Sequence, residues 1–217
     1  MTANASPYEF DRRSLFYPLI TNYLILLAGF KEFGAAGLAL LIKEMPQGRI
    51  QDLLTDAEKR GNIDQVRRLL DTTPLELYEP LVMVSEQSHE KVQIDLTLTM
   101  REIAQHSSFL VQRVAPAAMG GLLIQAYEST SDHHDRQPLW EFLRHCRNAA
   151  AHGGRFNLLH GEPHRPARWG RFSIEPTLHG TYLAARPERQ GLLAPGDALR
   201  LLWDIEQAYP SIIDLSV

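Results

Sequence analysis

Residues 139–156 read LWEFLRHCRNAAAHGGRF, and this stretch predicts an amphipathic helix with a defined end. At about 100° per residue, one side of the helical wheel is apolar and the other is largely polar. The apolar arc contains Leu139, Phe142, Leu143, Cys146, Ala149 and Ala150. The polar arc contains Trp140, Glu141, Arg144, His145, Arg147, Asn148, Ala151 and His152. Because Pro138 suits the first helical turn and Gly153 suits the left-handed position after the last, the pattern predicts a helix buried on one face only.

Three residues on the polar arc have the chemistry for phosphodiester cleavage. Asn148 and His152 are four residues apart, so their side chains are expected to lie one above the other. A neutral imidazole with a pKa of about 6.5 can take a proton from a hydroxyl and return one to a leaving group. The guanidinium of Arg147 can bind the negative charge that develops on a phosphate. The set suits metal-independent RNA cleavage by the 2′-hydroxyl, and the alternative is a polar face that is simply solvated.

The spacing of Arg and His alone is not specific. An Arg is followed five residues later by a His in three places, at Arg101 and His106, Arg147 and His152, and Arg155 and His160. Only the middle pair has a neutral polar residue directly after the Arg, on a helix pattern that ends at the His. The middle pair is therefore the candidate catalytic pair.

Residues 146–156, CRNAAAHGGRF, resemble the signature of the HEPN superfamily, which is an Arg, a polar residue, three variable positions and a His. The run from Gly196 to Glu206 resembles the closing helix of bacterial members. The resemblance implies a helical bundle that often dimerises to bring two motifs into one cleft, and in many members a metal-independent endoribonuclease. It implies catalytic roles for Arg147 and His152 and a supporting role for Asn148.

The same resemblance implies a biological setting and an alternative function. Many bacterial HEPN ribonucleases are toxins or phage-defence effectors, so an antitoxin or defence partner is expected. Other members are inactive and serve as modules for RNA or nucleotide binding or for protein dimerisation. A non-catalytic module is therefore the alternative.

Positive charge is concentrated around the motif. The chain has 217 residues, 44% hydrophobic content and a net charge of −4, which indicates one substantial core and no overall attraction to nucleic acid. Residues 144–190 nevertheless contain eight Arg, no Lys and three Glu, a local charge of +5. Such a region would attract an RNA backbone, and Arg144 and Arg155 beside the motif are the candidate substrate-binding residues.

The single cysteine and the histidine clusters give little support for other chemistries. Cys146 excludes an internal disulfide, fits a cytoplasmic location and is expected in the core. A structural metal at residues 132–135 (DHHD) or at His160 and His164 has no zinc-site context, so no metal is predicted. The absence of a phosphate-binding Gly-rich loop leaves a nucleotide cofactor unsupported, so no cofactor is predicted.

The organisation along the chain predicts one mostly α domain over residues 1–217. Its sections are N-terminal helices (1–72), central helices with the motif (73–155), a small β-hairpin or ordered loop insertion (156–190) and a closing helix (195–211). Within the insertion, Arg171 to Glu175 alternates as a half-buried strand does, and Leu178 to Leu183 is its expected partner. The insertion either forms a wall of the site or caps the core.

The apolar run Leu15 to Ile42 is expected to form two buried helices joined near residues 30–34. Lys31 and Glu32 interrupt it, and glycines lie on both sides of that charged pair, which argues against a membrane-spanning helix. Acidic and basic residues before the run argue against a secretory signal. A second subunit of a homodimer could cover this apolar pair.

The section between this run and the motif is expected to be helical. Helices are predicted over 49–60 and 63–70 with a turn at Gly61 and Asn62, and a new helix start over 73–76. Apolar residues then recur at helical intervals through Leu77, Leu81 and Val84 and again over 92–114. Pro116 marks a break before a helix over 117–128.

Overall fold

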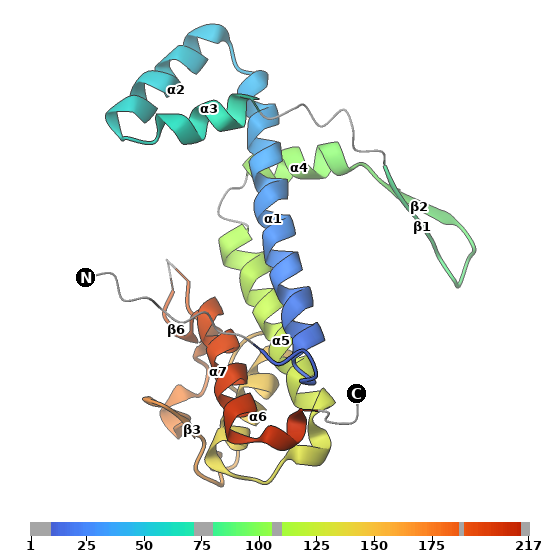
Figure 1. The fold of residues 1–217 in the computed structure, drawn as a ribbon, viewed down its shortest axis with the longest axis vertical. Coiled ribbons are helices and arrows are strands. Elements are labelled where there is room, and N and C mark those ends of the chain that lie inside the picture. Colours follow the sequence, from blue (N-terminus) through green and yellow to red (C-terminus); the bar gives the residue numbers. More distant parts are fainter. Residues whose placement is uncertain (1–9, 72–79, 106–109, 187–188, 214–217) are drawn as a thin grey trace. The chain divides into compact units, whose positions relative to one another are not determined.

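The structure is a computed structural model that describes residues 10–71, 80–105, 110–186 and 189–213. The chain is mostly helical, with 60% of residues in helices and small two-stranded sheets, which confirms the predicted fold class at that level. Internal contacts divide it into two compact units, residues 1–27 with 111–217 and residues 28–110 (Figure 1). Helix α1 (Tyr17–Lys43) contributes to both units. The single domain over residues 1–217 stays a prediction.

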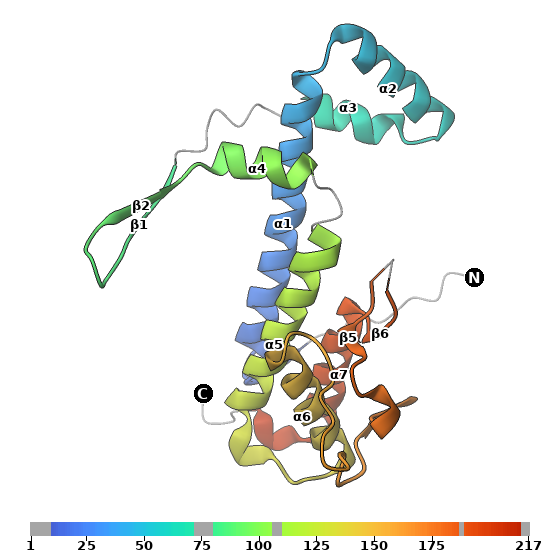
Figure 2. The same ribbon diagram turned by 180° about the vertical axis from the view of Figure 1, so that it is seen from behind.

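Three helices and the first part of α1 build the unit that carries the motif. They are α5 (Ala115–Ser129), α6 (Pro138–Ala151) and α7 (Pro195–Ala208), each with a proline in its first turn, where an amide donor is not needed. Figures 1 and 2 both show these three helices side by side. Their apolar faces meet in one core, which includes Phe16, Met119, Leu123, Phe142, Leu201 and Ile205. The predicted helix over 117–128 and the predicted closing helix are confirmed.

The insertion before α7 contains two short sheets. Strand β3 (Arg168–Trp169) pairs antiparallel with β4 (Phe172–Ser173), and β5 (Tyr182–Ala184) pairs parallel with β6 (Gly191–Leu193). A small β insertion is confirmed, but the predicted pairing of 171–175 with 178–183 is wrong. The 3-10 turn η3 (Pro176–Leu178) follows β4, and the amide of Ile174 donates to the carbonyl of Ala167, which holds β4 against the residues before it.

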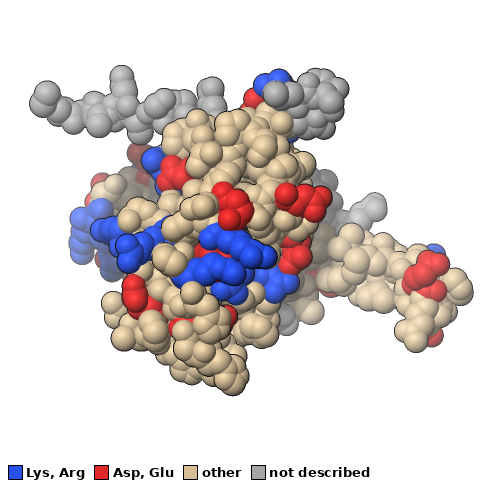
Figure 3. Space-filling view, turned by 90° about the horizontal axis from the view of Figure 1, so that it is seen from below, with Lys and Arg blue, Asp and Glu red and all other residues tan. Residues whose placement is uncertain are grey.

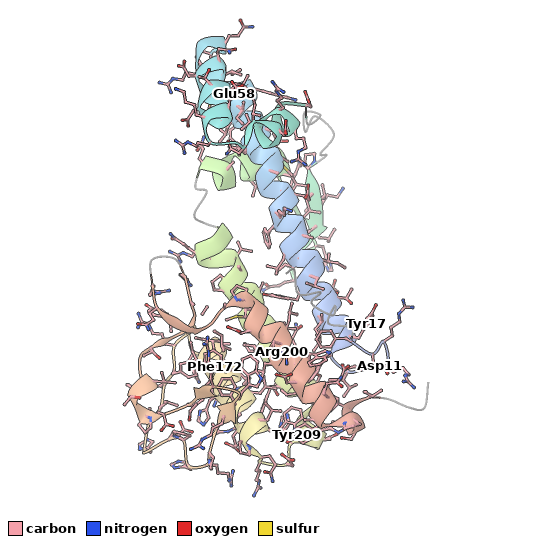
Figure 4. All side chains as sticks on the ribbon, turned by 60° about the vertical axis from the view of Figure 1, so that its left-hand side comes forward. Asp11, Tyr17, Glu58, Phe172, Arg200 and Tyr209 are labelled. Atoms are coloured by element: carbon pink, nitrogen blue, oxygen red, sulfur yellow. The ribbon has the colours of Figure 1, made fainter. Side chains whose placement is uncertain are left out.

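The insertion caps the core, which is one of the two roles that the sequence left open for it. The buried side chains of Ile174, Leu183 and Leu193 belong to the core. The indole nitrogen of Trp169 donates to Asp204 of α7 at 2.8 Å, and Arg200 binds the same carboxylate. Arg200 on α7 and Phe172 on β4 are labelled in Figure 4, and Phe172 stacks on Trp169 with ring centroids 5.5 Å apart.

The second unit contains the remainder of α1, two short helices, a hairpin and α4. Helices α2 (Gln47–Lys59) and α3 (Ile63–Asp71) confirm the predicted pair over 49–60 and 63–70. Strands β1 (Leu81–Val84) and β2 (Lys91–Ile94) form an antiparallel hairpin, and α4 (Leu96–Gln105) follows it. A π-helical turn, η1 (Leu110–Val114), precedes α5.

The helical prediction for residues 81–84 and 92–94 is wrong. Leu81 and Val84 are three residues apart, a spacing that a short apolar run of β-formers satisfies as easily as a helix does. The run 81–84 is too short for the helical period to decide between the two. The predicted helix start over 73–76, and Leu77, lie outside the described residues.

The prediction of two buried helices over residues 15–42 is also wrong. Residues 17–43 form one continuous helix, α1, because a glycine in a helix interior lowers stability by about 1 kcal/mol without breaking the helix. Leu24, Ile25 and Leu26 are exposed. Among the described residues, α1 is the one helix long and apolar enough to cross a membrane by length and composition. The interpretation that it does not span a membrane stays a prediction.

Replacement of Gly37 by alanine is expected to destabilise the second unit. The added methyl group would overlap the backbone carbonyl of Met100 where α4 lies against α1. Met100 is fully buried, so the two helices must separate, and such overpacking costs about 1–3 kcal/mol. Urea unfolding of wild type and Gly37→Ala measures the loss of unfolding free energy.

Gly29→Ala is the matched control on the same helix. No atom lies within 4 Å of the methyl group that this change adds. Because alanine favours helix over glycine by up to about 1 kcal/mol, Gly29→Ala is expected to be neutral or stabilising. Equal effects of the two substitutions would contradict the close approach at Gly37.

Candidate functional site

Helix α6 ends where the sequence predicts. The amide of Gly154 donates to the carbonyl of Ala149 at 2.8 Å, and Gly153 and Gly154 have φ values of +73° and +76°. This is the Schellman arrangement, which glycine favours because it has no Cβ. The cap places His152 directly after Ala151, the last residue of α6, and the amide of His152 donates to the carbonyl of Asn148 at 3.0 Å.

The apolar arc of α6 is confirmed, and the polar arc is partly wrong. Phe142, Leu143, Cys146 and Ala149 are buried as predicted. Trp140, Glu141 and His145 were assigned to the polar arc and are also buried. A helical wheel shows only which residues share a face of one helix, not what covers that face. The connection after α6 returns over the N-terminal half of the polar arc and contacts it through Glu162 and Arg165.

Two of the three motif residues contact each other. The Nη1 of Arg147 donates to the Oδ1 of Asn148 at 3.2 Å. The Nε of Arg147 donates to the Oε1 of Glu128 on α5 at 2.8 Å, and its Nη2 forms a second short bond to the same oxygen. Glu128 therefore fixes the guanidinium from the neighbouring helix, and the sequence pattern held no signal for this partner.

His152 lies apart from that pair. Its side chain is exposed and makes no side-chain hydrogen bond within the part of the chain that the structure describes. The backbone bond of the cap joins Asn148 and His152, and no hydrogen bond joins their side chains among the described residues. The structure thus brings Arg147 and Asn148 together and leaves the imidazole of His152 open to solvent at the end of the helix.

The two candidate substrate-binding arginines are engaged in contacts within the protein. The Nε of Arg144 donates to Glu141 at 2.9 Å, and its Nη2 lies 2.9 Å from the Nε2 of His145. Arg155 donates to the carbonyl of Gly180 at 2.8 Å, and its guanidinium lies 3.7 Å from the centre of the Tyr182 ring. A role in substrate binding stays a prediction for both.

A charged cavity of about 480 Å³ lies on the N-terminal half of the polar face of α6. Its walls come from α5, α6 and two connections, and they include Tyr127, His134, Arg136, Trp140, Glu141, Arg144, Glu162, His164 and Arg165. The buried carboxylate of Glu141 accepts from Arg144 and, at 3.4 Å, from Arg165. Viewed from below, the surface has basic side chains gathered beside acidic ones (Figure 3).

Sequence reasoning found only part of this cavity. Glu141 and Arg144 have the i, i+3 spacing of a helical ion pair, which the sequence displays. Glu162 and Arg165 belong to the connection after α6, where no periodic pattern signals a return to the helix. The insertion therefore forms a wall of the cavity as well as a cap on the core.

Burial lowers the pKa of two histidines near the cavity. Burial and the adjacent Arg144 guanidinium lower the pKa of His145 below its usual value. Burial lowers the pKa of His134 as well, and its ring lies 4.1 Å from Tyr127 and 4.6 Å from Trp140 between centroids. Both imidazoles are therefore favoured in the neutral form.

Acidification is expected to destabilise the fold through His145. Its pKa in the unfolded chain is near 6.5 and its folded pKa is lower, so the unfolded state binds more protons. This contribution to stability is complete above about pH 6.5 and decreases below it, by up to about 1.4 kcal/mol per pH unit. Thermal unfolding at about pH 7.5 and about pH 5.5 should show a smaller loss in His145→Gln than in wild type. An identical loss in both proteins would contradict this role.

The segment 132–135 and Cys146 have defined contacts within the protein, and the absence of a metal site stays a prediction. No group of three potential metal ligands occurs within the described ranges. In the 132–135 segment, His134 lies 3.3 Å from the hydroxyl of Thr130 and Asp135 accepts from the amide of Gln137. Cys146 is fully buried, and burial raises the pKa of its thiol, which confirms its assignment to the core.

Comparison of the chain with family models, with curated proteins and with solved structures gave no match. The resemblance to the HEPN superfamily therefore depends on the residues of the motif, and membership stays a prediction.

Proposed function

We propose that this protein is a metal-independent endoribonuclease of the HEPN type that cleaves RNA by attack of the 2′-hydroxyl on the adjacent phosphate. The observation that carries the proposal is the end of α6, where the bonded pair Arg147 and Asn148 is followed by an exposed His152. In this reaction His152 exchanges protons with the 2′-hydroxyl and the leaving oxygen. Arg147 stabilises the charge on the phosphate, and Asn148 holds the guanidinium.

Glu128 is a further part of the proposed site. Its carboxylate binds Arg147 and is about half exposed, as is usual for an ion pair that solvent reaches. A phosphate would replace this carboxylate or share the five guanidinium donors with it. A homodimer that sets two α6 faces against each other would provide a second copy of these groups, as the family resemblance implies.

The test is an RNA cleavage assay in excess EDTA with analysis of the product ends. Wild type is expected to yield 2′,3′-cyclic phosphate ends, and Arg147→Ala is expected to lose this activity. Arg147 and Glu128 are both partly exposed, so this substitution should leave the fold intact. Absence of cleavage by folded wild type across total RNA would contradict the proposal.

The second candidate function is a non-catalytic module for RNA binding or dimerisation. The ion pair with Glu128 favours it, because a reacting phosphate would have to displace this carboxylate or share Arg147 with it. The exposed Leu24, Ile25 and Leu26 of α1 also suit coverage by a second copy. Light scattering of wild type and Ile25→Lys distinguishes a homodimer through this face from a monomer.

The resemblance of residues 146–156 also supports a cytoplasmic toxin or phage-defence role with an antitoxin or defence partner. Arrest of bacterial growth on induction of wild type, and its loss in His152→Ala, tests that role.

A further inference from the structure

We propose that the charged cavity beside α6 binds one nucleoside monophosphate unit of the RNA strand next to the cleaved bond. The inference rests on the proposed function, because it assigns a specificity subsite to the same helix face. It concerns binding rather than cleavage, so it can be tested without turnover.

The cavity and the motif share one face of α6. Arg144 lines the cavity, and Asn148 is four residues further along the helix, about 6 Å along the axis and on the same side. A phosphate bound at Arg147 and Asn148 would therefore leave the neighbouring nucleotide of the strand within reach of the cavity. The volume of about 480 Å³ lies within the usual range for small-ligand sites.

One wall of the cavity is aromatic. The His134 ring lies between Tyr127 and Trp140, with centroid distances of 4.1 Å and 4.6 Å. Tyr209, which follows α7 and is labelled in Figure 4, packs on Trp140 with ring centroids 5.2 Å apart. The half-buried Tyr127 also lines the cavity, and a tyrosine ring is of the kind on which a nucleobase stacks with little dependence on its identity.

The charged residues that line the cavity have an excess of positive charge. Three arginines line the cavity against two glutamates, and Glu141 accounts for bonds to both Arg144 and Arg165. Arg136 is exposed at the cavity, and among the described residues its side chain has no hydrogen bond or ion pair. An arginine fork without a carboxylate partner is suited to bind a phosphate through two parallel bonds.

The buried polar groups distinguish this cavity from a solvated surface cluster. Glu141 is 4% exposed and His145 is 2% exposed, and both are held by Arg144. The indole nitrogen of Trp140 is buried and has no acceptor among the described residues. A wall whose ion-pair network is already formed costs little reorganisation when a planar anionic ligand enters.

The experiment is isothermal titration of the full chain, in low salt, with the four nucleoside 5′-monophosphates. The matched nucleosides and inorganic phosphate are titrated in parallel. We expect at least one monophosphate to bind, and at least tenfold more tightly than either its nucleoside or phosphate. Arg136→Gln should weaken that binding at least tenfold. Arg171→Gln removes an exposed arginine that does not line the cavity and should leave binding unchanged.

A second variant reports on the aromatic wall. Tyr127→Phe keeps the ring and should retain binding, whereas Tyr127→Leu should weaken it while circular dichroism shows the native helix content. Phosphate binding as tight as the monophosphate would overturn the nucleotide assignment, and so would the absence of binding by all four monophosphates.

The experiments distinguish failure of the ribonuclease proposal from failure of the nucleotide-site proposal. His152→Ala should retain monophosphate binding, because His152 does not line the cavity. Monophosphate binding without RNA cleavage would contradict the ribonuclease and leave the nucleotide site. RNA cleavage without monophosphate binding would contradict the nucleotide site and leave the ribonuclease.

Discussion

His152→Ala is expected to lower the rate of EDTA-resistant RNA cleavage by about 10²–10⁴-fold, the usual contribution of a general acid or base. The same change is expected to leave the free energy of unfolding within about 0.5 kcal/mol of wild type. The reason for this difference is the position of the side chain, which is exposed at the end of α6 and contributes nothing to the core. Single-turnover cleavage and urea unfolding measure the two quantities on the same preparation.

His160→Asn is the matched control for this substitution. Arg155 and His160 repeat the spacing of Arg147 and His152, but His160 lies in a connection with φ of +54°. Asparagine tolerates that backbone conformation, so the fold should be unaffected. Full activity in His160→Asn and none in His152→Ala would assign the chemistry to the motif. A His152→Ala protein that loses stability along with activity would instead assign this residue a structural role.

The end of α6 could be predicted because its signals are local. Pro138 sets the first turn, and Gly153 and Gly154 adopt the positive φ values that stop the helix. The apolar positions Phe142, Cys146 and Ala149 have the spacing of one helical face. Each signal lies within a few residues of the feature it determines, so no knowledge of the rest of the fold was needed.

The continuous helix α1 and the hairpin β1–β2 could not be predicted in the same way. In α1, Lys31 and Glu32 are exposed, so the charges interrupt the apolar composition without interrupting the helix. In the hairpin, Leu81 to Val84 are all exposed, and the alternation that marks a half-buried strand is absent. Period and composition therefore gave no basis for the correct assignment.

In the candidate site too, contacts between neighbours in the sequence could be predicted and contacts between distant residues could not. Arg147, Asn148 and His152 follow from the motif, and Arg147 with Asn148 is a contact between neighbours in sequence. Glu128 is 19 residues from Arg147 and reaches it only because α5 and α6 pack together. Arg165 is 24 residues from Glu141 and reaches it through an irregular connection. Contacts of this kind depend on the tertiary fold, and a single sequence has no pattern for them.

Phe142→Ala is expected to lower the free energy of unfolding of the motif-bearing unit by about 3–5 kcal/mol. Phe142 is fully buried in the core and packs against Trp169 of β3 with ring centroids 5.8 Å apart. Removal of the ring loses its apolar burial and leaves a cavity between α6 and the insertion. Urea unfolding followed by circular dichroism measures the loss.

Phe172→Ala is the control. Phe172 also stacks on Trp169, with ring centroids 5.5 Å apart, but it is only half-buried. It is expected to cost about 1–2 kcal/mol. Equal losses in the two variants would contradict the central place of Phe142. Because Phe142 is fully buried and His152 is exposed, their substitutions should separate folding from chemistry. Phe142→Ala should retain cleavage per folded molecule, and His152→Ala should retain the fold without cleavage.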